Sequence, residues 1–164
     1  MAKRSLPSPA RARKAGASRR PGKAVDASIR YIESSALVAA LLEHDTAAIG
    51  PRTPGIRYVT SALTFAESGR AIIRARAAGR LTAADEQAAV RALRTFERRC
   101  FVLDVNRAVL ARVRRRFPLE PIRTLDAVHL ATAEVLGESP QLVTVVSRDA
   151  RVRENAQALG YVVA

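Results

Sequence analysis

From residue 28 onward, short apolar runs alternate with longer segments whose apolar residues recur at helical spacing. The short runs predict strands at 29–32, 56–60, 101–103, 142–146 and 161–163. The longer segments predict helices at 36–42, 63–78, 83–99, 108–117, 125–136 and 151–159. Strands that alternate with helices need crossover connections, which make the strands parallel and cover both faces of the sheet. The pattern therefore predicts an α/β fold in three layers, with a central, mainly parallel sheet flanked by helices.

Polar residues at the ends of these segments predict where the helices begin and end. Ser34 and Ser35 are candidate caps for helix 36–42, Thr82 for helix 83–99 and Thr124 for helix 125–136. Pro118 is expected to end the basic helix 108–117, because proline cannot continue a helix.

Residues 1–27 differ in composition from the rest of the chain. They hold eight lysines and arginines against a single acid, Asp26, and little apolar surface that could be buried. We expect a disordered basic tail over 1–27 and one folded domain over 28–164. The interpretation we favour is a solvated tail without an essential role. A phosphate-binding arm, or a natural start further along at a residue such as Val25, would also fit.

The net charge of +13 and the isoelectric point near 11.4 favour an anionic partner. Nucleic acid is the commonest such partner, although an acidic protein or a membrane surface would suit the charge equally well. Cys100 is the single cysteine, which excludes an internal disulfide and fits a reducing cytosol. No apolar run approaches the ~20 residues of a membrane span, and no apolar segment typical of a secretory signal follows the basic start. We therefore expect a cytoplasmic protein without a membrane segment.

Four acidic residues follow or flank the predicted strands in a way that favours a metal site. Glu33 comes directly after strand 29–32, and Asp149 lies three residues after strand 142–146. Glu67 and Asp126 lie near the starts of their helices, where both could lean over the same sheet edge. Clustered carboxylates repel one another, and a divalent cation with a preference for oxygen ligands, such as Mg²⁺ or Mn²⁺, removes that repulsion. Such an ion can polarise a phosphodiester and ionise an attacking water.

Each acid also has a structural interpretation that needs no metal. Glu67 could pair with Arg70 or Arg74 along its helix. Asp126 and Asp149 could be first-turn acids favoured by the helix dipole. Glu33 could accept hydrogen bonds from amides at the strand end. Any one acid alone favours the structural interpretation, whereas the four together, in this order and on these elements, favour the metal site.

Two further residues near these elements are expected to be structural. Asp104 also ends a predicted strand, but we predict that it is not a ligand. His129 lies three residues after Asp126 on the same helical face and could be a ligand or a proton shuttle. Because Val128 and Leu130 flank it, the prediction is a packed and hydrogen-bonded histidine.

The segments that carry these acids resemble the successive motifs of PIN domains. They are Arg-Tyr-Ile-Glu-Ser-Ser-Ala-Leu at 30–37, Thr-Ser-Ala-Leu-Thr-Phe-Ala-Glu at 60–67, Thr-Leu-Asp-Ala-Val-His-Leu-Ala-Thr-Ala at 124–133 and Val-Thr-Val-Val-Ser-Arg-Asp at 143–149. In detail they are similar to the VapC toxins of bacterial type II toxin–antitoxin pairs. The resemblance spans residues 29–163 in order, and it is the ordered set rather than any single motif that is specific.

The resemblance implies a PIN-like fold and an endoribonuclease that needs Mg²⁺ or Mn²⁺ and uses a metal-activated water. By position, it implies that the catalytic, metal-binding acids are Glu33, Glu67, Asp126 and Asp149. The hydroxyl of Ser35 would orient the first acid, and that of Ser147 would lie near the fourth. The chain departs from the family at Glu33, where Asp is usual, and the extra methylene moves the carboxylate by over ~1 Å, which matters for the tight geometry of magnesium.

The family also implies partners: an RNA substrate, a small cognate antitoxin and a second copy in a homodimer. Arg123 and Arg148 adjoin the acids and are candidates for contact with RNA, as are Arg114 and Arg115 in the basic helix. That helix could equally bind an acidic segment of the antitoxin, or present a solvated face. The alternative function is a catalytically weak or inactive PIN-like module that binds nucleic acid or protein.

Overall fold

The computed structural model describes residues 28–50 and 53–164, and it contains a five-stranded sheet with helices on both faces. The strands are β1 (Ile29–Ile32), β2 (Arg57–Ser61), β3 (Phe101–Leu103), β4 (Val143–Val146) and β5 (Val162–Val163). All of the strand pairs are parallel, in the order β3-β2-β1-β4-β5. The predicted parallel α/β sheet is therefore confirmed.

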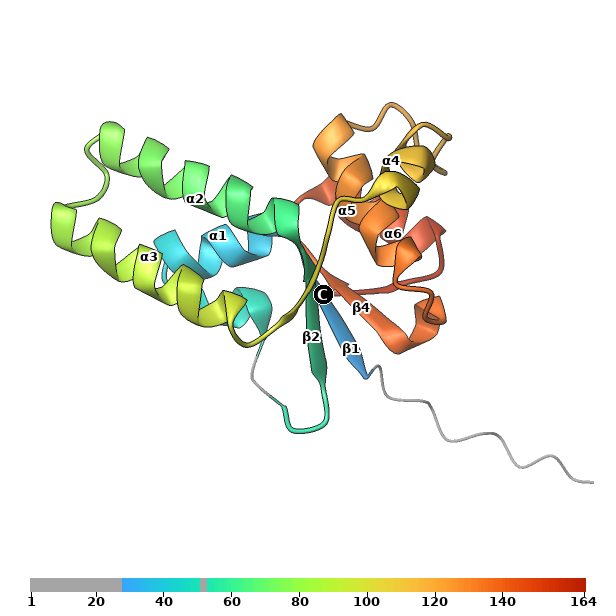
Figure 1. Cartoon of the computed structure of the whole chain (residues 1–164), viewed down its shortest axis with the longest axis horizontal. Coiled ribbons are helices and arrows are strands. Elements are labelled where there is room, and N and C mark those ends of the chain that lie inside the picture. The colour runs from blue at the N-terminus through green and yellow to red at the C-terminus, as the bar shows by residue number, and fades with distance from the viewer. Residues whose placement is uncertain (1–27, 51–52) are drawn as a thin grey trace, which may run out of the picture.

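The helices form the two outer layers of the molecule. They are α1 (Ser34–Leu42), α2 (Ala62–Ala77), α3 (Ala83–Glu97), α4 (Arg107–Val113), α5 (Thr124–Val135) and α6 (Ala150–Ala158). Helices α1 to α3 pack together on one side of the sheet, and α4 to α6 pack together on the other (Figure 1). Two short 3-10 helices, Thr46–Ile49 and Pro140–Leu142, were not predicted. No described helix is both long and apolar enough to cross a bilayer.

The order of the strands places a topological switch point between β1 and β4. From β1 the chain builds outward through β2 and β3, and then returns to add β4 and β5 on the other side. In open parallel sheets, a crevice opens outside the carboxyl ends of the strands at such a point, and ligands bind there. Glu33 follows β1 and Ser147 follows β4, so both lie at this edge of the sheet. The region beside these two residues is called the crevice below.

Alternating side chains of β1 divide the core between the two faces of the sheet. Ile29 and Tyr31 point into the core beneath α4 to α6, whereas Ile32 packs with Leu37 and Phe96 beneath α1 to α3. This two-residue period is the one that a strand buried on both faces requires. Burial of Tyr31 on the α5 side brings its hydroxyl within reach of that helix.

Two predicted helix caps need correction. Helix α1 is capped by the side chain of Glu33, which accepts a hydrogen bond from the Ser35 amide, so Ser34 and Ser35 lie inside the helix instead of capping it. Thr124 is the first residue of α5, and the residue at the N-cap position is Arg123, whose side chain makes no capping hydrogen bond. Thr82 does cap α3, as predicted, in a reciprocal capping box with Asp85.

Helix α4 ends at Val113, four residues before the predicted end. The reason is tertiary, because the Phe117 side chain is buried in the core and must leave the helical path to reach it. The Arg112 guanidinium lies 3.9 Å from the centroid of the Phe117 ring and pairs with Glu134 of α5. The proposed tail over residues 1–27 lies outside the described residues.

Candidate metal centre

Glu33 is placed at the crevice by the central strand that it follows. Its backbone amide still donates to the carbonyl of Val146 at 2.9 Å, which continues the pairing of β1 with β4. The Glu33 residue is only 4% exposed. A buried charge in this position requires strong hydrogen bonds or a counter-ion.

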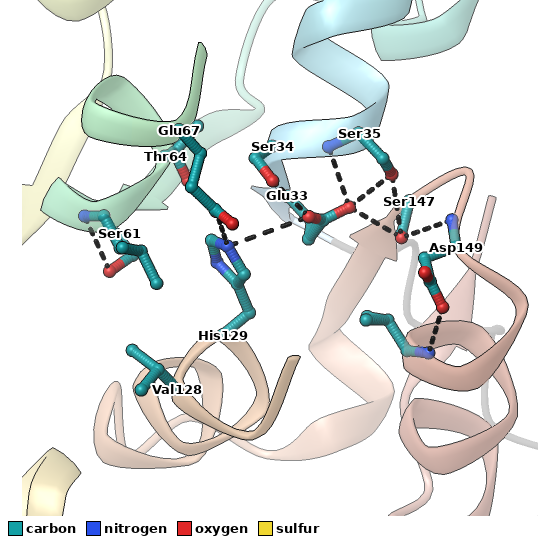
Figure 2. Close-up of polar contacts among 12 residues, drawn as sticks. Glu33, Ser34, Ser35, Ser61, Thr64, Glu67, Val128, His129, Ser147 and Asp149 are labelled. Atoms are coloured by element: carbon teal, nitrogen blue, oxygen red, sulfur yellow. Dashed lines mark hydrogen bonds and ion pairs between the residues drawn. The ribbon is translucent and has the colours of Figure 1, made fainter. Parts of the chain in front are cut away.

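Serines supply most of those hydrogen bonds (Figure 2). The Oε2 atom of Glu33 accepts from the Ser35 amide at 3.0 Å, from the Ser35 hydroxyl, and from the Ser147 hydroxyl at 2.8 Å. The Oε1 atom accepts from the Ser34 hydroxyl at 2.5 Å. The longer side chain of glutamate is therefore held firmly, and Oε1, which faces Glu67 and His129, is the less crowded oxygen.

Glu67 reaches the same crevice from the second turn of α2. Ser61 caps the start of this helix, because its hydroxyl accepts from the Leu63 amide at 3.2 Å. The neighbouring Thr60 hydroxyl lies 2.6 Å from the carbonyl of Ile32 and 2.8 Å from the hydroxyl of Thr64.

The Glu67 side chain is 24% exposed. Partial burial opposes its ionisation, but His129, the Ser34 hydroxyl and the charge of Arg74 together hold the pKa of Glu67 below its ordinary value.

His129 of α5 stands between the two glutamates (Figure 2). Its Nε2 atom lies 2.7 Å from Oε2 of Glu67 and 3.7 Å from Oε1 of Glu33, and its side chain is 1% exposed. The structure thus confirms a packed, hydrogen-bonded histidine, and the partner of Glu67 is this residue rather than Arg70 or Arg74. One ligand atom each from Glu33, Glu67 and His129 lies within 4.8 Å of the other two.

Asp126 and Asp149 border this tight group without belonging to it. Burial raises the pKa of Asp126, and the charges of Asp149 and Glu33 raise it further. Among the described residues, no hydrogen-bond donor reaches the buried Oδ2 atom of Asp126. A buried carboxylate oxygen without a partner, surrounded by other acids, is an arrangement that a cation would relieve.

Asp149 has a structural task as well as its place beside Asp126. It is the N-cap of α6, and its Oδ1 atom accepts from the amides of Arg151 at 2.8 Å and Val152 at 3.3 Å. The Ser147 hydroxyl accepts from the Asp149 amide at 3.1 Å. Ser147 therefore connects the loop that carries Asp149 to the Glu33 carboxylate.

The basic residues singled out from the sequence lie at different distances from this site. Arg123 is near enough for its charge to lower the pKa of Asp126 against the larger opposing effects. The guanidinium of Arg148 instead pairs with Asp45, while its backbone amide donates to the Ser35 hydroxyl at 2.8 Å. Arg114 and Arg115 are exposed beyond the end of α4.

Sequence reasoning did not assign a place in the site to Ser34 or Tyr31. The Ser34 hydroxyl donates to Glu33 and also helps to lower the pKa of Glu67, so it lies between both carboxylates. Tyr31 contacts His129 from within the core. The adjacency of Ser34 to Glu33 was a usable signal, whereas the contact of Tyr31 with a residue 98 positions away could be found only from the fold.

The parallel sheet, the switch-point crevice and the gathered acids are those of a PIN-type domain, and the PIN-domain family model matches residues 30–158. The chain therefore belongs to the PIN-domain family. The family model and the similar proteins described below each match most of this chain, so the relationship concerns the described domain rather than one motif.

Two kinds of relative support this assignment. Ribonuclease VapC35 of Mycobacterium tuberculosis, from the CDC 1551/Oshkosh and ATCC 25618/H37Rv strains, is 37% identical over 139 residues, covering 81% of this chain and 93% of the relative. The crystal structure of PAE2754 from Pyrobaculum aerophilum matches with a TM-score of 0.50 at 21% identity, covering 82% of this chain and 89% of that chain. The second likeness concerns the fold alone.

Proposed function

We propose that this chain is a metal-dependent endoribonuclease in which Glu33, Glu67, Asp126 and Asp149 hold a divalent cation, Mg²⁺ or Mn²⁺. The observation that carries the proposal is the buried Oδ2 atom of Asp126, which lies beside other acids and accepts no hydrogen bond from the described part of the chain. Hard oxygen ligands of this kind suit Mg²⁺ and Mn²⁺. The similarity to a relative named a ribonuclease supports RNA as the substrate.

The ion would supply positive charge that polarises the phosphodiester and acidifies an attacking water. The chain's own groups have separate tasks. Ser35 and Ser147 keep the Glu33 carboxylate in one orientation, with Oε1 towards Glu67. Fixed carboxylates lose little conformational freedom when a cation binds, and so the site is preorganised.

The substrate and partners follow from charge and from the family. A net charge of +13 attracts the phosphate backbone of RNA, and Arg123 lies beside Asp126 where it can contact a phosphate. Arg148, Arg114 and Arg115 are further candidates for that contact. The similarity to VapC toxins supports a small antitoxin partner and a homodimer as the assembled forms.

A second candidate function is a module that binds RNA without cutting it. The observation that favours it is the number of hydrogen bonds to Glu33, whose Oε2 atom accepts three of them, one of which caps α1. An oxygen occupied in this way has little capacity left for a cation.

Both candidates are tested by incubating the purified protein with RNA in Mg²⁺ or Mn²⁺, beside the Asp126→Asn and Asp104→Asn variants. Asp104 is a matched control because it also follows a strand, and we predict that it is not a ligand. We expect cleavage by the wild type and by Asp104→Asn, but not by Asp126→Asn. Equal cleavage by all three proteins would show that Asp126 is not needed for cleavage and would refute the proposed site. RNA binding without cleavage by the wild type would favour the second candidate.

A further inference from the structure

A buried chain of hydrogen bonds connects the central strand to the edge of the site. Tyr31 of β1 is 0% exposed, and its hydroxyl lies 3.2 Å from Nδ1 of His129. The opposite ring nitrogen, Nε2, lies 2.7 Å from Oε2 of Glu67. All three side chains come from different elements, β1, α5 and α2, so the chain also fixes those elements relative to one another.

The chemistry of the three groups sets the direction of these hydrogen bonds. An ionised carboxylate can only accept, so the hydrogen between His129 and Glu67 is on Nε2. In a neutral imidazole the other nitrogen, Nδ1, is then an acceptor. The Tyr31 hydroxyl, 3.2 Å away, can donate to that acceptor. In a neutral ring, the contact with Tyr31 therefore favours the tautomer whose hydrogen lies towards Glu67.

Glu67 depends on this support more than Glu33 does. The Glu33 carboxylate accepts from three serine hydroxyls and one backbone amide, and it is almost fully buried. The Glu67 side chain is 24% exposed, and a rotation towards solvent would take its carboxylate away from Glu33. The short contact with His129 opposes such rotation.

We propose that Tyr31 and His129 are positioning residues, which hold the Glu67 carboxylate beside Glu33 in the orientation that the cation requires. The inference rests on the proposed function, since it concerns the same cation site. A residue that orients a metal ligand in this way typically contributes roughly 10- to 100-fold to metal affinity.

The Tyr31→Phe variant tests the first half of this chain, because it removes only the hydroxyl and keeps the buried ring. The measurements are the affinity for Mn²⁺ by isothermal titration, and the ¹⁵N chemical shifts of the His129 ring in the metal-free protein. We expect an Mn²⁺ affinity about 10-fold weaker and ring shifts that move away from a pure Nε2–H tautomer. Tyr161→Phe is the matched control, because Tyr161 is also buried but belongs to the chain before β5, and it should leave both measurements unchanged.

A comparison of His129→Gln with His129→Ala tests the second half. The glutamine amide can present an N–H donor at a similar reach, so His129→Gln should retain more Mn²⁺ affinity than His129→Ala at equal thermal stability. This comparison also tests whether His129 positions the Glu67 carboxylate if the Tyr31→Phe variant does not fold. Wild-type affinity in Tyr31→Phe and in His129→Ala would overturn the positioning role while leaving the proposed cation site intact. A wild type that binds no Mn²⁺ would overturn the site, and the positioning role with it.

Discussion

Replacement of Asp126 by asparagine is expected to stabilise the protein in the absence of metal, although it should abolish cation binding. The Asp126 side chain is partly buried, its Oδ2 atom accepts no hydrogen bond from the described residues, and its pKa is raised by burial and by Asp149 and Glu33. Each of these effects acts against the charged carboxylate at neutral pH. An uncharged amide of the same shape escapes the repulsion.

The size of the effect can be bounded from the environment of the Oδ2 atom. A buried polar atom without a partner costs about 1–3 kcal/mol. Asparagine keeps part of this cost because its amide is also polar, so we expect a gain near the lower end, about 1 kcal/mol. For a domain of this size, that gain corresponds to a melting temperature higher by roughly 3–5 °C.

A bound cation should reverse which of the two proteins, the wild type or Asp126→Asn, has the higher melting temperature. At a free Mn²⁺ concentration 100 times the dissociation constant, binding stabilises the wild type by about 2.7 kcal/mol. The Asp126→Asn variant should gain little, and the wild type should then melt at the higher temperature.

The assay is thermal unfolding followed by circular dichroism, first with a chelator and then across a Mn²⁺ titration. The Asp104→Asn variant is the control, because Asp104 is exposed, and it should follow the wild type in both conditions. Equal or lower stability of Asp126→Asn in chelator would show that the fold does not oppose the Asp126 charge. Equal stabilisation of both proteins by Mn²⁺ would show that Asp126 is not a ligand.

Three other expectations concern residues outside the acidic cluster. The Thr82→Ala variant should lose the cap of α3 and about 1 kcal/mol of stability, seen as a lower urea midpoint at an unchanged slope. The side chain and backbone of Thr82 lower the pKa of Asp85 in the folded protein. The wild type should therefore be more stable than Asp85→Asn above pH ~4. This difference in stability should disappear as the pH falls through the folded-state pKa of Asp85. The Asn155→Ala variant should leave the amide and carbonyl of Leu119 without the Asn155 side chain as their partner, at a cost of about 2 kcal/mol of stability. Hydrogen exchange at the Leu119 amide should become faster, and unchanged exchange there would contradict this role of Asn155.

The sequence was sufficient for the sheet because its signals are local. Each strand is a short apolar run, each crossover contains a helix, and parallel pairing follows from that alternation. Helix ends were harder to predict, because they depend on groups outside the helix. Glu33, rather than the neighbouring serines, caps α1, and α4 ends early because the Phe117 side chain is buried in the core.

The site was predictable to the extent that strand ends determine it. The placement of Glu33 followed from the carboxyl end of β1, and the order of the acids pointed to one crevice. The contacts of His129 did not follow, because they depend on how α5 lies against α2, and Glu67 is 62 positions away. A helical histidine between apolar neighbours is typical of a core residue, and its partner can be read only from the packed structure.

The position of β4 beside β1 has a consequence for synthesis of the protein. The first strand of the described domain ends in Glu33, but one of its two partners in the sheet is made more than a hundred residues later. A nascent chain that has released α1 to α5 still lacks both Ser147, which steadies the Glu33 carboxylate, and Asp149. Domains generally fold as units, so the crevice cannot be completed until β4 leaves the ribosome. Partly translated chains should therefore lack a complete acidic site beside the RNA of the ribosome that makes them.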